Sequence, residues 1–372
     1  MSSPSTDKMR VHIAGLLSQK RNYRQEVKDL TQKYQYVVVY GCGKILNSIV
    51  DTWNEYIGRR IDYSCDSDTA KWGKEFCGAK CLSPDQLTAI KDKCAVFVTV
   101  GDFRPVYDFL IERGFPSVNL IYKYDLVASE FLARHDQEEI LAKLCETYDL
   151  LADEQSNQVF DAIVNRVLGD GGNIDIMLDV CEKNQYFPPD IITLSEHERL
   201  VDIGAFNGDT IRDFTARTQG RFDQIFAFEV NATNFKALQK DVQQMPGRER
   251  VKIFNSGIWD SERDITYSIG ESQSTVGAVG EGRGHVVPLD GVLRNEKVTF
   301  IKMDIEGAEP QALRGAANII RNQRPKLAIC IYHDFAHLWE IPLYIKKLVP
   351  EYKIHLRHHT TLEYETVCYA TI

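Results

Sequence analysis

The chain has 372 residues, of which 44% are hydrophobic and 26% are charged, and its formal net charge is −9. This composition allows two ordinary domains, each with its own core, and excludes a chain that is disordered throughout. Acidic and basic residues are well mixed, which disfavours broad binding to nucleic acid or to anionic membranes. No run of about 18 apolar residues is present, and the amino-terminal residues lack the apolar core of a signal peptide. We therefore expect a cytoplasmic protein that binds neither nucleic acid nor a membrane.

Nine cysteines are scattered over the chain, and Cys94, Cys330 and Cys368 lie inside apolar runs. An odd number in this distribution favours reduced thiols in a cytosolic protein over a disulfide framework. The four cysteines between Cys65 and Cys94 cluster loosely, but they lack the paired C-x-x-C spacing of structural zinc sites. We expect packed or incidental thiols here rather than zinc.

The first part of the chain predicts a helical segment followed by alternating strands and helices. Residues 1–34 show a helical pattern, and "YVVVY" is then a β-branched strand that leads into Gly41 and Gly43. Further strands are expected at "RRIDYSCDSD", ending at Asp66, at "CAVFVTVGD" (94–102) and at "SVNLIY" (117–122), with helical patterns between them. This order predicts a Rossmann-like α/β domain over residues 35–126, with a parallel sheet covered by helices.

Residues 127–183 are predicted to be a helical connector, and residues 184–372 to be a second α/β domain. In that domain a short loop joins the last two predicted strands, which must therefore be antiparallel, since a parallel crossover needs a longer connection. We expect a mostly parallel seven-stranded sheet that ends in an antiparallel hairpin. Its strands are expected at 199–204, 224–230, 250–258, 298–305, 326–333, 352–358 and 363–370.

The motif "VDIGAFNGDT" at residues 201–210 is the first candidate for ligand binding. An apolar strand ends in a glycine-bearing loop, and a helix begins near its end, so a ligand would lie beyond the carboxyl end of the strand. Asp202 would suit an ammonium group, and Glu229, after the next strand, could accept hydrogen bonds from two ribose hydroxyls. The alternative is a helix cap for Asp209 or Thr210 and a surface acid for Glu229. The other loop candidates are Gly204, Ala205, Phe206, Asn207 and Gly208.

The third strand of this domain ends in "NSGIWD". In a mostly parallel sheet that ends in an antiparallel hairpin, the adenine of a bound cofactor would lie at this point. Ser256 and Gly257 could contact the adenine with backbone groups, although a plain turn is nearly as good an interpretation for each residue. Val230, next to the ribose acid, completes the set of predicted cofactor contacts.

With these motifs in view, residues 184–372 resemble the FkbM family of S-adenosylmethionine-dependent methyltransferases. The resemblance rests on "VDIGAFNGDT", "FAFEVN", "VPLDGVL", "TFIKMDIEGAEPQALRGA" and "RPKLAICIYH", with "NQYFPPD" before them and "LRHHTTLEYETVCYA" after them. It implies a Rossmann-like class I methyltransferase fold, S-adenosylmethionine as cofactor, and methyl transfer to a hydroxyl of a glycan or natural product. Val230 stands where the family often has proline, which leaves the ribose acid in place.

Methyl transfer to an alcohol needs an aligned nucleophile and a base that takes its proton. His333, which closes "AICIYH", is predicted to act as base or orienter, with a satisfied structural histidine as the alternative. We expect Asp304 to lie closest to the cofactor and Glu306 to bind or orient the acceptor. Glu306 could instead be an acid of the first helical turn, which is the favoured interpretation of Glu309.

Lys302 is the unexpected residue in an otherwise apolar strand. A lysine in a central strand must lose its solvation or find a partner. The simpler interpretation is an ion pair with Glu306 or Asp304, and the sharper one is contact with the substrate or tuning of the catalytic acids. Asp304 and Glu306 would also suit magnesium, but two carboxylates are too few, so no metal is predicted.

Two further features are less specific. The segment "ESQSTVGAVGEGRGHV", at residues 271–286, is expected to be a mobile loop over the acceptor pocket with Ser274 and Thr275 as contacts, or else a hairpin tip. Asp290 is expected to N-cap the helical turn that follows it.

The amino-terminal domain carries only a partial dinucleotide fingerprint. "YGCGK" supplies Gly41 and Gly43, and Asp66 ends the next strand, but Leu46 occupies the third glycine position. The stretch after it is similar to small Rossmann-type domains of nucleotide-sugar-modifying proteins. The domain would then bind a nucleotide or nucleotide-sugar at these three residues, or serve packing and homo-oligomerisation, which we favour slightly.

The resulting functional prediction is O-methylation of a sugar or glycan precursor with S-adenosylmethionine. One alternative is methylation of a small natural-product hydroxyl. The other is a nucleotide- or sugar-binding module whose methyltransferase fold is not catalytic.

Overall fold

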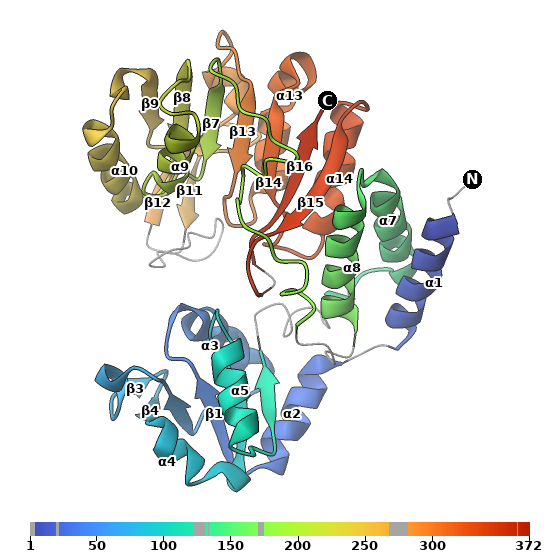
Figure 1. Cartoon of the computed structure of the whole chain (residues 1–372), viewed down its shortest axis with the longest axis vertical. Helices are drawn as coiled ribbons and strands as arrows, with labels where there is room; N and C mark the ends of the chain where they lie inside the picture. The colour runs from blue at the N-terminus through green and yellow to red at the C-terminus, as the bar shows by residue number, and fades with distance from the viewer. Residues whose placement is uncertain are drawn as a thin grey trace. The chain divides into compact units, whose positions relative to one another are not determined.

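The computed structural model describes residues 4–19, 22–121, 131–132, 134–169, 175–267, 282–362 and 364–372. The chain divides into two compact units (Figure 1). The amino-terminal unit comprises Met1–Ala142, Asp161–Asp179 and Thr360–Glu363, and the carboxy-terminal unit comprises Lys143–Phe160, Val180–His359 and Tyr364–Ile372.

The amino-terminal unit has a six-stranded sheet in the order β3-β4-β2-β1-β5-β6. Its strands are parallel except for the β3–β4 hairpin, which the sequence analysis did not predict because these strands are too short for a periodic pattern. The core packs Trp53 edge-on against Phe97, with ring centroids 5.0 Å apart. The strands are β1 (Tyr36–Tyr40), β2 (Tyr63–Cys65), β3 (Glu75–Phe76), β4 (Ala79–Leu82), β5 (Cys94–Val98) and β6 (Val118–Leu120). The helices are α1 (Pro4–Ser18), α2 (Tyr23–Lys33), α3 (Lys44–Tyr56), α4 (Pro84–Thr88) and α5 (Arg104–Glu112), with 3₁₀ turns at Thr69–Lys71 and Lys91–Lys93.

The carboxy-terminal unit is built on a seven-stranded sheet in the order β15-β16-β14-β13-β7-β8-β9. The five strands from β14 to β9 run parallel, and β16 is antiparallel to both of its neighbours, which confirms the predicted class I methyltransferase plan. Its strands are β7 (Arg199–Ile203), β8 (Gln224–Phe228), β9 (Val251–Phe254), β13 (Phe300–Met303), β14 (Lys326–Cys330), β15 (Lys353–His358) and β16 (Thr366–Thr371). Its helices are α9 (Asp209–Arg217), α10 (Ala232–Gln244), α11 (Leu289–Val292), α12 (Glu309–Gly315), α13 (Ala317–Gln323) and α14 (His337–Leu348), with a 3₁₀ turn at Arg248–Arg250.

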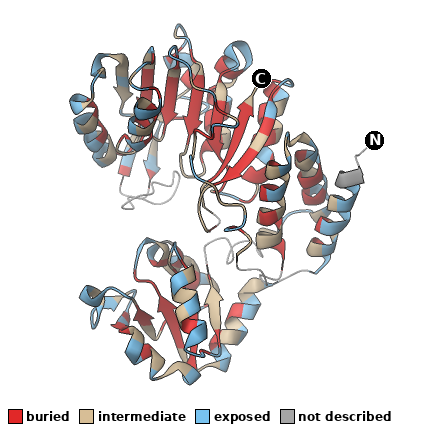
Figure 2. Ribbon diagram, in the orientation of Figure 1, coloured by how far each residue is buried: buried red, intermediate tan, exposed pale blue. Residues whose placement is uncertain are grey.

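The central strands of this sheet are buried along almost their whole length (Figure 2). Parallel strands covered on both faces need apolar side chains in both directions, which accounts for their β-branched and aliphatic sequences. Phe300 and Leu200 pack on one face with Phe214 of α9 and Leu238 of α10. The charged pair within β7 and β13 is therefore exceptional and belongs to the site described below.

The strand predicted at 250–258 is two strands in different sheets. β9 ends at Phe254, and β10 (Gly257–Ile258) joins a three-stranded sheet with β12 (Gly282–Val287) and β11 (Arg263–Tyr267), in the order β10-β12-β11. Asn255 separates the two strands, since its side chain donates to the carbonyl groups of Glu229 and Val230. An apolar pattern alone does not mark such a change of sheet.

The helices of the predicted connector are shared between the two units. The described helices of the connector, α7 (Gln137–Leu150) and α8 (Glu154–Leu168), are each divided between the two units. Asp153, between them, accepts hydrogen bonds from Arg357 and His355 of β15. The side chain of Arg357 is buried, with 2% of the residue exposed. Burial would raise the pKa of Asp153, but these hydrogen bonds hold it well below its usual value. This network ties residues 143–160 to the carboxy-terminal unit, whereas the sequence predicted a boundary at residue 184.

No helix among the described residues combines the length and the apolar character needed to cross a membrane. All nine cysteines are free thiols.

Candidate active site

The loop after β7 lies directly against the end of β13. Gly204 has φ of +79°, and a Cβ atom at this position would lie only 1.9 Å from the carbonyl oxygen of Asp304. Glycine is therefore required for the close approach of these two backbones. Gly208 has φ of +88° and is the N-cap residue of α9, so the predicted helix begins at Asp209. The motif thus places its loop beside Asp304.

Glu229 ties this loop to the end of β8. Its carboxylate accepts hydrogen bonds from the backbone N–H of Phe206 at 2.9 Å and from that of Asn231 at 2.8 Å. The side chain is buried, and burial raises its pKa even though these hydrogen bonds oppose the shift. Each oxygen retains a further lone pair, so the carboxylate can still accept a ligand hydroxyl.

Asp202 and Lys302 form an ion pair inside the sheet. They lie opposite each other on the neighbouring strands β7 and β13, with 3.0 Å between Lys302 Nζ and Asp202 Oδ1, and their side chains are 3% and 0% exposed. Lys302 Nζ also donates to the carbonyl oxygen of Gly204 at 2.8 Å. The expected ion pair of Lys302 is therefore present, but its partner is neither Glu306 nor Asp304. The predicted contact of Asp202 with a ligand ammonium group has no support here, because the buried Lys302 already matches its charge.

The other predicted cofactor residues line the same edge of the sheet. Asn207 accepts hydrogen bonds from Arg212 through its backbone and side-chain oxygens, and Asp209 accepts from the backbone N–H of Thr210. Gly257 begins β10 and packs on Val286, with Val230 close by. Ala205 and Ser256 are buried or half-buried in the loops that follow β7 and β9, and Thr210 is buried in the first turn of α9.

His333 lies at the centre of a cluster of three carboxylates. Its Nδ1 is 2.9 Å from Glu309 Oε1, and its Nε2 is 3.4 Å from both Asp304 Oδ1 and Glu306 Oε2. The imidazole is 7% exposed and Glu309 is fully buried, whereas Asp304 and Glu306 are 22% and 23% exposed. We call these four residues the acid–histidine cluster. Glu306 has φ of +59°, a conformation that bends the chain after Asp304 and Ile305.

The charges in this cluster decide the protonation state of His333. Burial alone would lower the pKa of the imidazole, but the charge of Glu309 and the nearby carboxylates of Glu306 and Asp304 raise it well above its usual value. Burial would raise the pKa of Asp304, but the charges of His333 and Lys302 hold it below its usual value. An imidazolium has no free lone pair, so this arrangement favours the orienting role of His333 over the predicted role as base.

Glu309 was expected to be only an acid of the first helical turn. It does begin α12, and its Oε1 accepts from the backbone N–H of Ile305 at 2.9 Å. Yet its side chain is also a buried partner of His333 and lies 3.6 Å from His337 Nδ1. The correction follows from packing, since folding brings His333, which follows β14, against the first residue of α12, and a local pattern does not reveal this contact.

Four residues of the site were not predicted from the sequence. Tyr186 and Tyr332 donate hydrogen bonds to the two carboxylate oxygens of Asp304, at 2.8 and 3.1 Å. Gln185 donates to Glu365, and the hydroxyl of Tyr332 is 3.5 Å from the same carboxylate. "NQYFPPD" and the end of the chain were noted only as resemblances to a family, and no spacing signal connected them to Asp304.

Residues 202–356 match the family described as "Methyltransferase FkbM domain". The carboxy-terminal unit contains an FkbM methyltransferase domain. Its cofactor is S-adenosylmethionine. Among curated proteins there is no match.

One solved structure shares the fold of this chain, and others match it more weakly. The crystal structure of methyltransferase FkbM from Methylobacillus flagellatus KT has a TM-score of 0.76 and 21% sequence identity, and the match covers 98% of this chain and 99% of that chain. A SAM-dependent methyltransferase from Aquifex aeolicus has a TM-score of 0.29, 12% identity and coverage of 47% and 84%. TrmK from M. capricolum, in complex with S-adenosyl-homocysteine, has a TM-score of 0.28, 10% identity and coverage of 48% and 62%. The first likeness shows a shared fold, and the other two are too weak to carry an argument.

The residues of the FkbM domain fit this cofactor. Glu229 is a buried carboxylate with acceptor capacity left for ribose hydroxyls, and it stands beside a loop whose backbone can approach a ligand closely. The ionised Asp304 adjoins that loop and would favour a sulfonium charge. When bound, the cofactor supplies an electrophilic methyl group.

Among the residues of the carboxy-terminal unit that the structure describes, two sets have ligand atoms close enough to hold a metal ion. One is Asp304, Glu309 and His333, and the other is Asp304, Cys330 and Glu365, with all ligand atoms of each set within 4.8 Å of one another. Metal ligation requires a neutral histidine or a deprotonated thiol, whereas the pKa values of His333 in the first set and of Cys330 in the second are raised. The prediction of no metal therefore stays a prediction, tested below.

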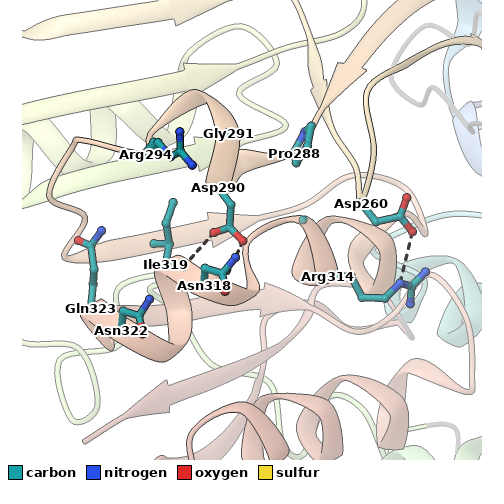
Figure 3. Close-up of a pocket in the computed structure, with 11 residues that line it drawn as sticks. Asp260, Pro288, Asp290, Gly291, Arg294, Arg314, Asn318, Ile319, Asn322 and Gln323 are labelled. Atoms are coloured by element: carbon teal, nitrogen blue, oxygen red, sulfur yellow. Dashed lines mark hydrogen bonds and ion pairs between the residues drawn. The ribbon is translucent and has the colours of Figure 1, made fainter.

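A separate hollow of about 730 Å³ lies on the FkbM domain between α11, α12 and α13 (Figure 3). It reaches Gln323, whose side chain contacts the backbone just before β13, and thus extends toward the amino end of that strand. None of the predicted cofactor or acceptor residues lines it. Asp290, at its wall, accepts from the backbone N–H groups of Asn318 and Ile319. Asp290 therefore caps α13. The expectation that it N-caps the helical turn directly after it was wrong.

Two other predictions concern less central parts of the chain. Ser274 and Thr275, expected over the acceptor pocket, lie outside the described residues. In the amino-terminal unit, Asp66 accepts from the backbone N–H of Cys42 and from Lys71 Nζ, both at 2.8 Å. Nucleotide binding at Gly41, Gly43 and Asp66 and the alternative packing role both stay predictions.

Proposed function

We propose that the FkbM domain transfers the methyl group of S-adenosylmethionine to a hydroxyl oxygen of a sugar or glycan precursor. The observation that carries this proposal is the acid–histidine cluster beside the cofactor loop, at the carboxyl ends of β13 and β14. Ligands of open α/β sheets bind at this edge.

A hydroxyl acceptor suits the chemistry of this edge. An alcohol is a weak nucleophile that must lose its proton as it attacks, and it needs hydrogen-bond partners that fix its direction. The partly exposed carboxylates of Asp304 and Glu306 can accept hydrogen bonds from acceptor hydroxyls. His333, held by Glu309, keeps both carboxylates in place. A site lined by acids, an amide and tyrosine hydroxyls supports a polyhydroxylated acceptor.

The charges also favour transfer from a sulfonium. Asp304 is kept ionised by two tyrosine hydroxyls and two cations, so a fixed negative charge stands beside the cofactor loop. Fixed dipoles and charges in a site with little water stabilise a charge distribution without reorganising during the reaction. Lys302 and Asp202 hold the underlying strands together rather than contacting the acceptor.

The proposal is tested with S-adenosylmethionine that carries a labelled methyl group. The full chain is incubated with nucleotide-sugars, methyl glycosides and a lysate of the source organism, and products are identified by mass and by NMR of the methyl carbon. We expect a labelled methyl ether on a sugar. A natural-product ether supports O-methylation with a different acceptor class, whereas a methyl group on nitrogen or carbon, or no product, overturns the proposal.

Variants locate the activity in this site. Asp304→Asn is expected to lose at least about 100-fold in turnover, because it removes the fixed charge and mismatches the two tyrosine donors. Asp260→Asn is the matched control, since Asp260 pairs with Arg314 at the surface beside the separate hollow. Equal losses in both variants would argue against a site at Asp304.

A further inference from the structure

Glu365 reaches the active-site edge because β16 runs against the direction of the other strands. β16 pairs antiparallel with β14, with Val367 opposite Cys330, so the residue just before β16 lies beyond the carboxyl end of β14. Glu365 stands there with φ of +64°, which turns its side chain away from the regular strand course. One oxygen of its carboxylate lies within 4.8 Å of a carboxylate oxygen of Asp304 and of the thiol sulfur of Cys330.

Charged and polar groups from three elements face this carboxylate. Gln185, on the segment before β7, donates a hydrogen bond to one oxygen, and the hydroxyl of Tyr332, after β14, is 3.5 Å from the other. Asp304 raises the pKa of Glu365, while His333 and Lys302 lower it. Cys330 and Tyr186, the other titratable groups nearby, are neutral because burial raises their pKa values well above the usual range.

We propose that Glu365 is the catalytic base, whose carboxylate takes the proton of the acceptor hydroxyl during methyl transfer. This inference rests on the proposed function. The O–H bond of the acceptor breaks and its proton passes to a carboxylate oxygen of Glu365. The hydroxyl oxygen forms the new bond to the methyl carbon as the bond from that carbon to the sulfonium sulfur breaks, and the electron pair stays on sulfur. Glu365 then releases the proton to water.

The other acids and the histidine of the site are poorer bases. Asp304 has a lowered pKa and accepts from a tyrosine at each oxygen, so it is better suited to remain a fixed charge. Glu309 is fully buried, and His333 carries its own proton. Burial first, and then the charge of Asp304, raise the pKa of Glu365 to about 7. Two neighbouring carboxyl groups with pKa values shifted in opposite directions are the usual pattern of divided acid–base roles.

The decisive variant is Glu365→Gln, which keeps the shape of the side chain and can still accept from Gln185. With the acceptor from the labelling experiment, we expect kcat to fall by about 10²–10⁴-fold, the usual contribution of general base catalysis. The KM values of acceptor and cofactor should change less than about threefold. Glu351→Gln is the matched control, because Glu351 is an exposed partner of Arg324, 53% exposed, just before β15.

The dependence of kcat/KM on pH separates catalysis from structure. The wild-type value should rise with pH through an apparent pKa of about 7. Glu365→Gln should lose this limb, and Glu365→Asp should keep it at a reduced rate. The inference is overturned if the Glu365→Gln variant folds, binds the cofactor and keeps the wild-type rate or the wild-type rise with pH. In that case the methyl ether made by the wild type still supports O-methylation. A wild-type chain without any methyl-ether product overturns both.

Discussion

Replacing Lys302 by methionine tests the buried ion pair under the active site. Lys302 and Asp202 are buried on neighbouring central strands, and removal of one partner leaves the other as a buried, uncompensated charge. Such losses cost about 3–5 kcal/mol, a large share of the total stability of a typical domain, about 5–15 kcal/mol. We therefore expect Lys302→Met to lower the free energy of unfolding of the carboxy-terminal unit by about 3–5 kcal/mol.

The pH dependence follows from the pKa of Asp202. Burial raises it to about 6, against the opposing charge of Lys302. The pKa of Asp202 is about 4 in the unfolded state and about 6 in the folded state. Between these two pH values the folded state binds more protons than the unfolded state, so stability falls as pH rises. Without Lys302 the folded pKa rises further and this range of pH extends upward. The deficit of Lys302→Met should thus be smaller at pH 5 than at pH 8.

Hydrogen exchange followed by mass spectrometry measures this effect in β7 and β13 of the full chain. Lys252→Met is the matched control, since Lys252 is a half-exposed partner of Glu296 and such surface pairs contribute below about 1 kcal/mol. Asp202→Leu combined with Lys302→Met should recover at least half of the deficit, because no unpaired charge remains. A loss below about 1 kcal/mol for Lys302→Met, or a double variant as unstable as the single one, would refute the reasoning.

Three further predictions concern the site. Glu229→Gln should weaken binding of S-adenosylmethionine about 10–100-fold in isothermal titration, because charge-assisted hydrogen bonds to the ribose are lost; an unchanged Kd with unchanged melting temperature would exclude the ribose role. Glu365→Gln should raise the free energy of unfolding by on the order of 1–3 kcal/mol at pH 8 and by much less at pH 4. The raised pKa of Glu365, about 7, means that the folded state favours the neutral carboxyl group. The wild type therefore loses stability as pH rises from about 4 to 7, and the variant does not. Equal melting temperatures of this variant and the wild type at both pH values would contradict that. Turnover should survive EDTA, because the raised pKa values of His333 and Cys330 keep a proton on one ligand of each candidate set. Activity lost to EDTA and restored by Mg²⁺ or Mn²⁺ would show a metal site instead.

Local patterns were sufficient for the seven-stranded sheet of the carboxy-terminal unit, but not for the three-stranded sheet of β10, β11 and β12. Apolar runs that end in glycine or acid predicted the strands of the main sheet, and the short loop before β16 predicted the antiparallel hairpin. The Gly204 loop and Glu229 were predicted from position alone, since the carboxyl ends of parallel strands meet at one edge. Such features depend on neighbours in the sequence or on a general rule of the fold.

The amino acid sequence thus determined the order of strands and helices, the methyltransferase plan and the edge at which the site forms. Only the tertiary structure decided that Lys302 pairs with Asp202, that Glu309 holds His333, and that Glu365 and Tyr186 join Asp304. Register between strands and the return of an antiparallel strand bring together residues that are more than a hundred positions apart in the case of Tyr186 and Asp304. A charge on one strand carries no mark of the partner that folding will place beside it. Contacts of this kind are set by packing over the whole sheet, and they are the ones that fix the protonation states of the site.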